Sequence, residues 1–463
     1  MQKQAAISVI RTLREHGHQA YLVGGCVRDL LLGREPADYD VSTDATPREV
    51  MNIFPETYAV GAQFGVVLVP VDGLSACDLE QAAAEQENQT PVEAAKHHAI
   101  EVATFRSDGL YSDGRHPDAV RFSKTAEEDV QRRDFTINGL LLDPLDHDRV
   151  IDYVGGRADL NAGMVRTIGD PERRFAEDKL RMLRAIRFAS RFGYQIDPKT
   201  FTAIQRLSPL IHQVSRERIR EELTKMLTEG HARQAFELLD KSGLLHEVLP
   251  EVEKMKGVEQ PPEFHPEGDV WVHTLGLLEK LDPGCSRTLA WGSLLHDVGK
   301  PPTFRVAPDR IRFDGHVDVG VAMARDICHR LRTSNDDTEQ ILALVQNHMK
   351  FADTPRMKES TLKRFMRLPN FPEHLALHRL DCLSSHADLS LYDFVSKKMA
   401  ETPAEEIRPE PLITGDDLIA LGHEPGPRFR EILSTVEDQQ LEGSLTTREA
   451  ALEFVRRTFP IAS

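Results

Sequence analysis

The apolar pattern of the chain changes near residue 155. Before that point, short apolar runs typical of strands alternate with stretches of helical period, and beyond it the pattern is helical nearly throughout. With 463 residues the chain is also too long for a single hydrophobic core. We therefore predict an α+β head, made of a small mixed sheet with helices, followed by an all-α body.

The expected elements of the head follow from its local sequence. AYLVGG (20–25) predicts a strand that turns into the helix CVRDLLLG, which Gly33 closes. Thr46-Pro47 predicts the start of another helix, with the threonine as its cap. The acidic, Gln- and Ala-rich segment 73–98 is expected to be a surface insertion, either partly helical or disordered. Further strands are expected at 39–44, 64–71 and 99–106.

The composition predicts a cytoplasmic protein. Hydrophobic residues make up 40% of the chain, which is ordinary for a soluble protein. No apolar run approaches the roughly 20 residues needed to cross a bilayer, and residues 1–20 lack the architecture of a signal peptide. The five cysteines are scattered without a CxxC pair. We therefore expect neither a membrane partner nor a disulfide-linked partner.

One segment of the chain is basic although the whole chain carries a net charge of −17. Residues 173–220 contain twelve Lys or Arg and four acids, a net charge of +8. Such a segment can be an electrostatic footprint for a polyanion. It can also be a solvated helix face, and charge alone favours that second interpretation.

The motif with the clearest chemistry is Gly24-Gly25-x-x-Arg28 followed by Asp38-x-Asp40. Residues two apart on a strand project to one face, so Asp38 and Asp40 present paired carboxylates. Paired carboxylates predict a cation between them, and Mg²⁺ prefers such oxygen ligands together with substrate phosphates. The glycine pair lets backbone amides approach a triphosphate, and Arg28 can add a fork of donors. The alternative is a loop with two solvated aspartates, which the Gly-Gly-x-x-Arg prefix makes the weaker interpretation.

LVGGCVRDLLLG and DYD resemble the signature of the polymerase-β-like, class II nucleotidyltransferases, the family of tRNA CCA-adding enzymes and poly(A) polymerases. Four later segments match the same family in the same order: EVATFR (101–106), YSDGRHPDAVRF (111–122), RRDFTINGL (132–140) and RRFAEDKLRMLRAIRFASRFGY (173–194). The resemblance covers about residues 20–240. It implies a template-independent, Mg²⁺-dependent enzyme that uses CTP and ATP to add CCA, or its terminal A, to the 3′ end of tRNA.

The resemblance also implies roles for further residues of the head. Arg133 and Asp134 of RRDFTIN are expected to bind the ribose and a phosphate of the nucleotide. Glu101 begins a predicted strand and is either a third carboxylate beside Asp38 and Asp40 or an ordinary edge-strand charge. With two Mg²⁺ ions at these carboxylates, the nucleotide α-phosphate and the RNA 3′-hydroxyl would be aligned for in-line transfer.

The helical segment after the head is expected to select the base and hold the RNA. Asp178 and Arg181 are expected one turn apart on one helix face, where they can pair with the Watson–Crick edge of a base. The alternative for these two residues is a simple i,i+3 salt bridge. Arg184 is expected to contact the nucleotide, and Arg187 and Arg191 to hold the RNA backbone.

The C-terminal half carries a second set of chemistry-bearing residues. They match the H…HD…D pattern of the HD phosphohydrolase superfamily, with two extra histidines where two-metal members carry ligands. The residues are His273, His296, Asp297, His316, His348 and Asp381. His and carboxylate ligands suit Mn²⁺, Ni²⁺, Co²⁺ or another divalent metal. The resemblance implies hydrolysis of phosphate esters such as 2′,3′-cyclic phosphates; the alternative is a degenerate module that helps grip RNA.

These patterns predict four domains. They are a nucleotidyltransferase head at 1–153 with the insertion 73–98, a helical nucleotide- and RNA-binding region at 154–255, an HD-type helical domain at 256–400, and a helical tail at 401–463.

The product is less determined than the chemistry. DPLDHDRVIDY (143–153) lacks the glycine pair of a DPxGG-like loop that CCA-adding enzymes often carry, which keeps poly(A) addition open. VGAQFGVVLV (60–69) resembles the CCA-adding branch instead, so CCA addition is preferred. Another class also stays open, an HD phosphohydrolase whose N-terminal half only binds RNA or nucleotides. A non-catalytic RNA binder is disfavoured, because it gains nothing from setting two carboxylates against a polyanion.

Overall fold

The computed structural model describes residues 2–55, 57, 65–70, 99–108, 120–263, 265–308 and 310–460. The chain divides into two compact units, Met1–Val248 and Leu249–Ser463. The expected insertion 73–98, most of the matched segment 111–122 and part of 60–69 lie outside the described residues.

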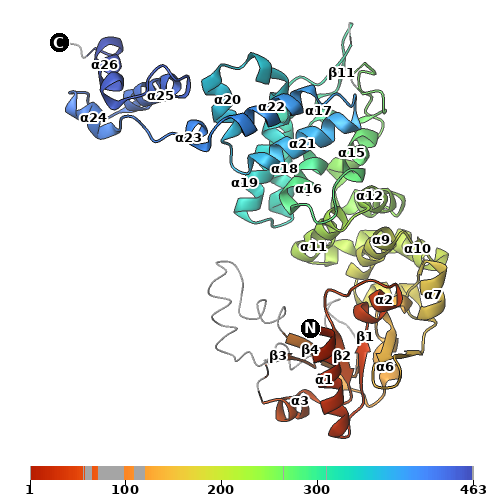
Figure 1. Cartoon of the computed structure of the whole chain (residues 1–463). Helices are drawn as coiled ribbons and strands as arrows, with labels where there is room; N and C mark the ends of the chain where they lie inside the picture. Colours follow the sequence, from red (N-terminus) through yellow and green to blue (C-terminus); the bar gives the residue numbers. More distant parts are fainter. Residues whose placement is uncertain are drawn as a thin grey trace. The chain divides into compact units, whose positions relative to one another are not determined.

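The centre of the first unit is a mixed six-stranded sheet of order β3-β4-β2-β1-β7-β8 (Figure 1). Strands β2 and β4 pair in parallel, and the other neighbours are antiparallel. Its strands are β1 (Ala20–Val23), β2 (Asp40–Thr43), β3 (Val66–Pro70), β4 (Ala99–Thr104), β7 (Leu140–Asp143) and β8 (Arg149–Asp152). The four strands expected from the sequence are therefore present, and the mixed sheet of the head is confirmed.

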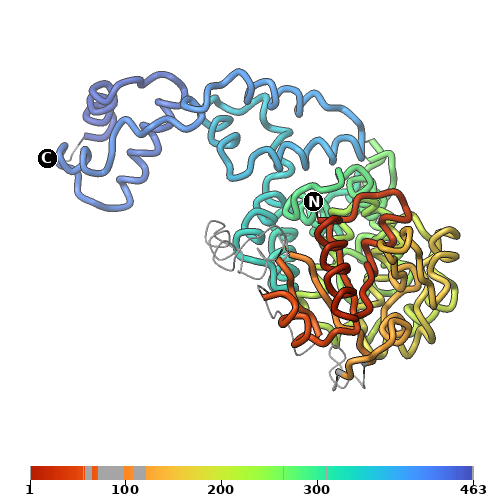
Figure 2. Tube along the Cα trace, turned by 60° about the horizontal axis from the view of Figure 1, so that its bottom comes forward, coloured from red at the N-terminus to blue at the C-terminus, as the bar shows by residue number. Residues whose placement is uncertain are grey.

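Short helices surround the sheet and begin where the sequence supplies caps. Helix α1 (Gln2–Glu15) packs against β1, β2 and β4 (Figure 2, red). Helix α2 (Gly25–Leu31) ends before Gly33, which has a positive φ of 68° as expected of a closing glycine. Helix α3 (Pro47–Ile53) is capped by Thr46, whose side chain accepts from Glu49 N–H.

The rest of the first unit is helical apart from short two-stranded pairs. Its helices are α6 (Ala126–Gln131), α7 (Gly156–Ala162), α8 (Pro171–Glu177), α9 (Leu180–Phe192), α10 (Pro198–Leu207), α11 (Arg216–Thr228), α12 (Ala232–Lys241) and α13 (Leu244–Val248). The pairs are β5 (Arg106–Asp108) with β6 (Val120–Phe122), and β9 (Met164–Val165) with β10 (Gln195–Ile196). Helix α9 packs against α11 and α12.

The second unit is almost entirely helical, as predicted for the body. Its main helices are α15 (Val270–Glu279), α16 (Arg287–Leu295), α17 (Lys300–Thr303), α18 (His316–Arg330), α19 (Asn335–Asn347), α20 (Glu359–Met366), α21 (Phe371–Ser384) and α22 (Ser390–Glu401). A hairpin of β11 (Arg305–Val306) and β12 (Ile311–Arg312) interrupts them and projects from the helices in Figure 1. Helices α15, α16, α19 and α21 pack on one another, which brings residues far apart in sequence to one place.

The tail of the second unit has an apolar core of its own. Helices α24 (Gly415–Ala420), α25 (Pro427–Leu441) and α26 (Arg448–Thr458) bury Leu418, Ile432 and Val455 against one another. It is joined to α20, whose Lys363 donates to the Leu441 carbonyl at 3.0 Å. None of the helices in the described part of the chain is long and apolar enough to cross a membrane.

Candidate functional sites

Three carboxylates meet at one end of the head sheet. The parallel pairing of β2 with β4 sets Asp40 opposite Glu101, so both side chains project from the same face. Asp38 precedes the strand by two residues and is exposed, while Tyr39 between them is 4% exposed. The arrangement brings Glu101 beside the two predicted aspartates, and the strand expected over 39–44 begins at Asp40.

The electrostatics of this cluster fit a divalent cation. Burial, with the Glu101 and Asp38 charges beside it, raises the pKa of Asp40 to about 7. The raised pKa means that ionising Asp40 beside two other acids is costly unless a positive charge balances them. Clustered carboxylate oxygens are the donors that Mg²⁺ prefers.

The turn between β1 and α2 lies beside the carboxylates. Gly24 has φ 78° and ψ −127°, a conformation essentially limited to glycine. A Cβ on Gly24 would lie 3.3 Å from Nη1 of Arg133. The positive charge of Arg133 partly offsets the rise in the pKa of Asp40, so this arginine faces both the turn and the carboxylates. Arg133 is held by Asp129, whose Oδ2 accepts from its Nη2 at 2.9 Å.

Arg28 is packed differently from the sequence-based expectation. It is 4% exposed and lies over the Phe192 ring at 4.6 Å. Its Nη1 donates to Asn138 Oδ1 at 2.6 Å and its Nε to Asp29 Oδ1 at 2.8 Å. In this packing Arg28 braces α2, and a contact with a phosphate would require it to give up these partners.

Asp134 forms a partly buried ion pair with Arg184. The Arg184 Nη2 and Nε lie 2.6 and 2.9 Å from Oδ2 of Asp134. Burial alone would raise the pKa of Asp134, but the arginine outweighs it and holds the pKa at about 2. The pair links α9 to the RRDFTIN segment, so two of the predicted nucleotide contacts are in direct contact with each other.

Asp178 and Arg181 do not share one helix face, which corrects the prediction. Asp178 ends α8 in an extended conformation, and α9 begins two residues later. Its Oδ2 accepts from Arg218 Nη2 at 2.8 Å. Arg181 instead donates to Glu177 Oε2 at 3.0 Å. The break occurs because Asp178 also accepts from a backbone N–H of α9, as aspartates at helix starts do. The simple i,i+3 salt bridge between Asp178 and Arg181 is likewise not formed.

Arg187, which was expected to hold the RNA backbone, is buried in an ion pair. It is 5% exposed, and its Nε donates to Glu222 Oε2 at 2.7 Å, so a contact with RNA would require it to leave this partner. Arg191 is more exposed and lies 3.3 Å from Glu229. The acids that balance these arginines lie on or just after α11, outside the basic segment in which the sequence count was made.

The six residues predicted in the second unit come together in two adjoining clusters. Asp297 lies between them, with Oδ2 3.2 Å from His296 Nε2 on one side. Its Oδ1 lies 3.9 and 3.7 Å from the Nε2 atoms of His316 and His348 on the other. The first cluster contains His273, His296 and Asp381, and the second contains Asp297, His316 and His348.

The orientation of the histidines fits metal ions. The Nδ1 atoms of His296, His316 and His348 each donate to a backbone carbonyl at 2.7–2.9 Å. The Nε2 atoms of His316 and His348 are buried and have no hydrogen-bond partner among the described residues. Burial lowers the pKa of His348 to about 4, so this nitrogen stays unprotonated. Unprotonated Nε2 atoms that converge on a carboxylate, with Nδ1 anchored behind, are the usual donor set of a metal centre.

Four more residues adjoin this centre and were missed from the sequence. Glu267 Oε1 lies 2.6 Å from Nδ1 of His273 and 3.0 Å from Nδ1 of His265. The Lys300 ammonium lies 2.7 Å from Asp297 Oδ2 and donates to Gln260 Oε1 at 2.6 Å. The i,i+3 spacing of Asp297 and Lys300 was a usable signal for the lysine. Glu267 and His265 lie in KGVEQPPEFHPEGD (256–269), whose prolines and glycines indicate a junction between domains and gave no signal of a site.

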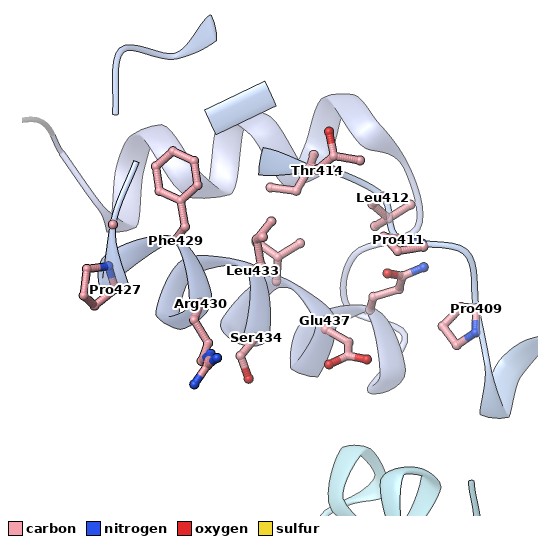
Figure 3. Close-up of a pocket in the computed structure, with 14 residues that line it drawn as sticks. Pro409, Pro411, Leu412, Thr414, Pro427, Phe429, Arg430, Leu433, Ser434 and Glu437 are labelled. Atoms are coloured by element: carbon pink, nitrogen blue, oxygen red, sulfur yellow. The ribbon is translucent and has the colours of Figure 1, made fainter. Parts of the chain in front are cut away.

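A groove of about 990 Å³ lies in the tail (Figure 3). Phe429 and Leu433 of α25 face the segment that carries Pro411, Leu412 and Thr414. None of the predicted site residues is among those that line it. The groove therefore belongs to neither of the two candidate centres.

Comparisons with known proteins match the segments of the chain that carry the two centres. Residues 20–166 match the family described as "Poly A polymerase head domain", 193–256 the "Probable RNA and SrmB- binding site of polymerase A", and 269–388 the "HD domain". Nucleotidyltransferase families and HD families use divalent metals.

Curated relatives are named CCA-adding enzymes. The chain is 41% identical over 241 residues to the one from Geobacillus stearothermophilus, covering 52% of this chain and 53% of that protein. It is 39% identical over 283 residues to the one from Bacillus pumilus, covering 59% and 64%. The alignments thus span about half to two-thirds of the length of these relatives.

Solved structures cover nearly the whole chain. The CCA-adding enzyme of Bacillus stearothermophilus in complex with CTP aligns over 98% of both chains, with a TM-score of 0.71 and 26% identity. The Thermotoga maritima CCA-adding enzyme complexed with tRNA aligns with a TM-score of 0.58 and 19% identity, which is a likeness of fold alone.

Proposed function

We propose, from the premise that this chain belongs to the class II family of CCA-adding enzymes and poly(A) polymerases with an HD domain, that it is a tRNA nucleotidyltransferase. It would add CCA, or its terminal A, to tRNA 3′ ends from CTP and ATP without a template. The observation that carries the proposal is the register of Asp40 opposite Glu101 beside the Gly24 turn. The curated relatives described above are named CCA-adding enzymes, which favours this product over poly(A).

Asp38, Asp40 and Glu101 would hold Mg²⁺ in the head. Bound there, the cation supplies positive charge at the nucleotide α-phosphate, the attacking 3′-hydroxyl and the departing pyrophosphate. The backbone at Gly24 and Gly25 leaves room for the phosphates, because a side chain at Gly24 would crowd Arg133. Arg133 is the donor best placed to bind them.

The ion pair of Asp134 and Arg184 would set the position of the nucleotide sugar. Asp134 stays ionised because Arg184 holds its pKa down, so it remains an acceptor for a ribose hydroxyl. Base selection by Asp178 and Arg181 would require both to exchange their present partners, Arg218 and Glu177, for the base. Arg191 is the remaining candidate for an RNA contact.

The histidine clusters of the second unit would form a phosphohydrolase centre with Mn²⁺, Ni²⁺ or Co²⁺. Nitrogen-rich ligand sets favour these metals over Mg²⁺. The expected reaction is opening of a 2′,3′-cyclic phosphate, in which water adds to phosphorus, the P–O3′ ester bond breaks and the released 3′ oxygen takes a proton, which leaves a 2′-phosphate and a free 3′-hydroxyl. Such a reaction would prepare damaged RNA ends for the head.

The chain would consist of the four domains predicted from its sequence. It comprises the head at 1–153, the nucleotide- and RNA-binding helices at 154–255, the HD domain at 256–400 and the tail at 401–463. A tRNA substrate and nucleoside triphosphates agree with the cytoplasmic location expected from the composition.

The test of the head uses full-length protein, Mg²⁺ and tRNAs that end at the discriminator base, at C or at CC. CTP and ATP are supplied separately and together, and products are resolved on sequencing gels. Addition of C, C and then A is expected. Addition of A to the CC-ended tRNA alone would indicate an A-adding enzyme, and long A tails would indicate a poly(A) polymerase. Either result would refute addition of the full CCA sequence. Asp40→Ala must abolish addition, whereas Asp146→Ala, in an exposed turn, must not.

The second centre is tested in parallel with adenosine 2′,3′-cyclic phosphate and Mn²⁺ or Ni²⁺. Turnover that His296→Ala abolishes and Asp40→Ala leaves intact is expected. If this were the protein's principal activity on RNA and no addition occurred, the phosphohydrolase alternative would stand instead.

A further inference from the structure

A buried acid of α6 lies behind the arginine that faces the Gly24 turn. Asp129 is 1% exposed. Its Oδ2 accepts from Nε of Arg133 at 3.2 Å and from Nη2 of the same arginine at 2.9 Å. Because the guanidinium is planar and rigid, two bonds along one of its edges fix the direction in which the rest of the group points. Asp129 therefore sets the orientation of Arg133.

This pairing turns the remaining nitrogen of Arg133 toward the nucleotide-binding turn. Asp129 accepts from Nε and Nη2, and a Cβ built on Gly24 would lie 3.3 Å from Nη1. The charge of Arg133 also reaches Asp40, because it partly offsets the rise in the pKa of that acid. Nη1 is thus directed at the place where the turn and the carboxylates of the head meet.

The same acid pairs with a second arginine, so the group as a whole stays cationic. Oδ1 of Asp129 accepts from Nε of Arg132 at 2.9 Å and from the backbone N–H of Arg106 at 3.3 Å. Burial would raise the pKa of Asp129, but the charges of Arg133 and Arg132 outweigh it and lower the pKa, so the acid stays ionised. Two guanidinium groups against one carboxylate leave positive charge for an anion. An arginine that is already ordered also loses less side-chain entropy when it binds that anion.

We infer that Asp129 is a positioning residue for the reaction proposed for the head, because it holds Arg133 in the orientation that binds the triphosphate of the incoming nucleotide. Asp129 acts through Arg133 and does not itself contact the nucleotide. The inference rests on the proposed transferase function and adds to it the residue that orients the phosphate-binding arginine.

The first test is kinetic and uses the full-length protein with Mg²⁺, ATP and a CC-ended tRNA. Asp129→Asn keeps the shape of the side chain and removes its charge, so Arg133 is no longer fixed. KM for ATP is expected to rise about tenfold, the lower end of what a hydrogen bond to a charged group contributes, and kcat to change little. The inhibition constant of inorganic tripolyphosphate, which has neither base nor sugar, should rise by the same factor.

The matched control is Asp143→Asn. Asp143 is 2% exposed and lies 2.7 Å from Arg14, so it is also a buried acid paired with an arginine of the head. Arg14 donates to the carbonyl of Ala20 at the start of β1, whereas Gly24 follows the end of that strand. The pair of Asp143 is therefore remote from the turn, and KM, kcat and tripolyphosphate inhibition should stay as in wild type.

A double-mutant cycle separates positioning from a general effect on folding. In Arg133→Ala the arginine is absent, so adding Asp129→Asn should raise KM for ATP no further. Arg133→Lys keeps the charge but not the planar fork, and it should raise KM about as much as Asp129→Asn does. Because Arg133→Lys leaves the buried acid in place, it also tests the inference if Asp129→Asn does not fold.

Binding without turnover distinguishes the inference from the function on which it rests. Calorimetric titration with Mg²⁺ and ATP gives the affinity of wild type and of Asp129→Asn directly. If wild type adds no nucleotide but Asp129→Asn weakens ATP binding about tenfold, the transferase is refuted and the positioning role stands. An unchanged KM and ATP affinity in Asp129→Asn would overturn the inference. So would unchanged tripolyphosphate inhibition, a full additional effect of Asp129→Asn in the Arg133→Ala background, or wild-type behaviour of Arg133→Lys.

Discussion

Replacing Asp40 with asparagine removes one carboxylate from the head cluster and keeps its shape. In the folded chain burial and the neighbouring Glu101 raise the pKa of Asp40 to about 7, from 3.8 in a model compound. Between these two values the folded chain holds a proton that the unfolded chain has released. Metal-free wild type therefore loses stability as the pH rises from about 4 to about 7, and no further above that. The Asp40→Asn protein carries no such penalty.

The size of the effect follows from the shift. A difference of about 3 pH units corresponds to about 4 kcal/mol, which is an upper bound. Part of Asp40 remains exposed, so solvent screens some of the repulsion. We therefore expect Asp40→Asn to raise the free energy of unfolding by about 2 kcal/mol. For a unit of this size such a gain raises Tm by about 4–8 °C.

The assay is thermal unfolding of the full chain in EDTA between pH 5 and pH 8.5. Asp40→Asn should exceed wild type by a margin that grows to pH 7 and then levels off. Asp38→Asn is the control: it removes an exposed charge of the same cluster and should change Tm far less. Adding Mg²⁺ should stabilise wild type and not Asp40→Asn. The reasoning is refuted if metal-free Asp40→Asn is the less stable protein above pH 7, or if the margin does not depend on pH.

Three further predictions concern single side chains. Glu267→Gln should lower the affinity of the second centre for Mn²⁺ about tenfold, because the acid orients His273 from behind; calorimetric titration measures this, and an unchanged affinity contradicts it. Gly299→Ala should weaken metal binding while circular dichroism keeps its helical signal, since a Cβ there would lie 2.1 Å from the His316 carbonyl oxygen. Arg187→Ala should cost about 3–5 kcal/mol in urea unfolding, because it strands a buried acid; a loss of RNA affinity at full stability would restore the surface role.

The elements that sequence predicted well depend on local patterns. The strands that carry Asp40 and Glu101 have the apolar period of strands. They pair in parallel with these two residues opposite each other, so Glu101 lies beside Asp40 as one of the two interpretations expected. The caps at Thr46 and the closing Gly33 are also local, since a cap needs only the side chain and the next turn. The HD residues lie on or close to helices of the predicted all-α body, and the packing of these helices brings the residues together.

The sequence did not reveal the partners of side chains when those partners are distant in the chain. Arg187 reads as one of a row of basic residues, and only the packing of α9 on α11 supplies Glu222. Arg28 reads as a surface arginine of α2, until Asn138, 110 residues later, accepts its bond. Neither partner has any spacing relation to the arginine, so no period could reveal it.

The helix break at Asp178 was a different kind of failure. The segment 173–194 has an unbroken helical period, and the period was followed through an aspartate that prefers the start of a helix to its interior. The capping preference was therefore available as evidence and was outweighed by periodicity. Where a strong cap residue falls inside an amphipathic pattern, the pattern alone does not establish a single helix.

The ion pairs change the meaning of the basic segment and of the acidic chain as a whole. Three of the arginines that give residues 173–220 their charge excess pair with acids outside that segment: Arg184 with Asp134, Arg187 with Glu222, and Arg191 with Glu229. Much of the excess thus holds helices together instead of forming an open field for a polyanion. Both candidate centres, moreover, set carboxylates where a phosphate would have to bind. An anionic substrate can approach such a site only if a cation lies between the two, so the carboxylates of both centres agree with the divalent metals that these families use.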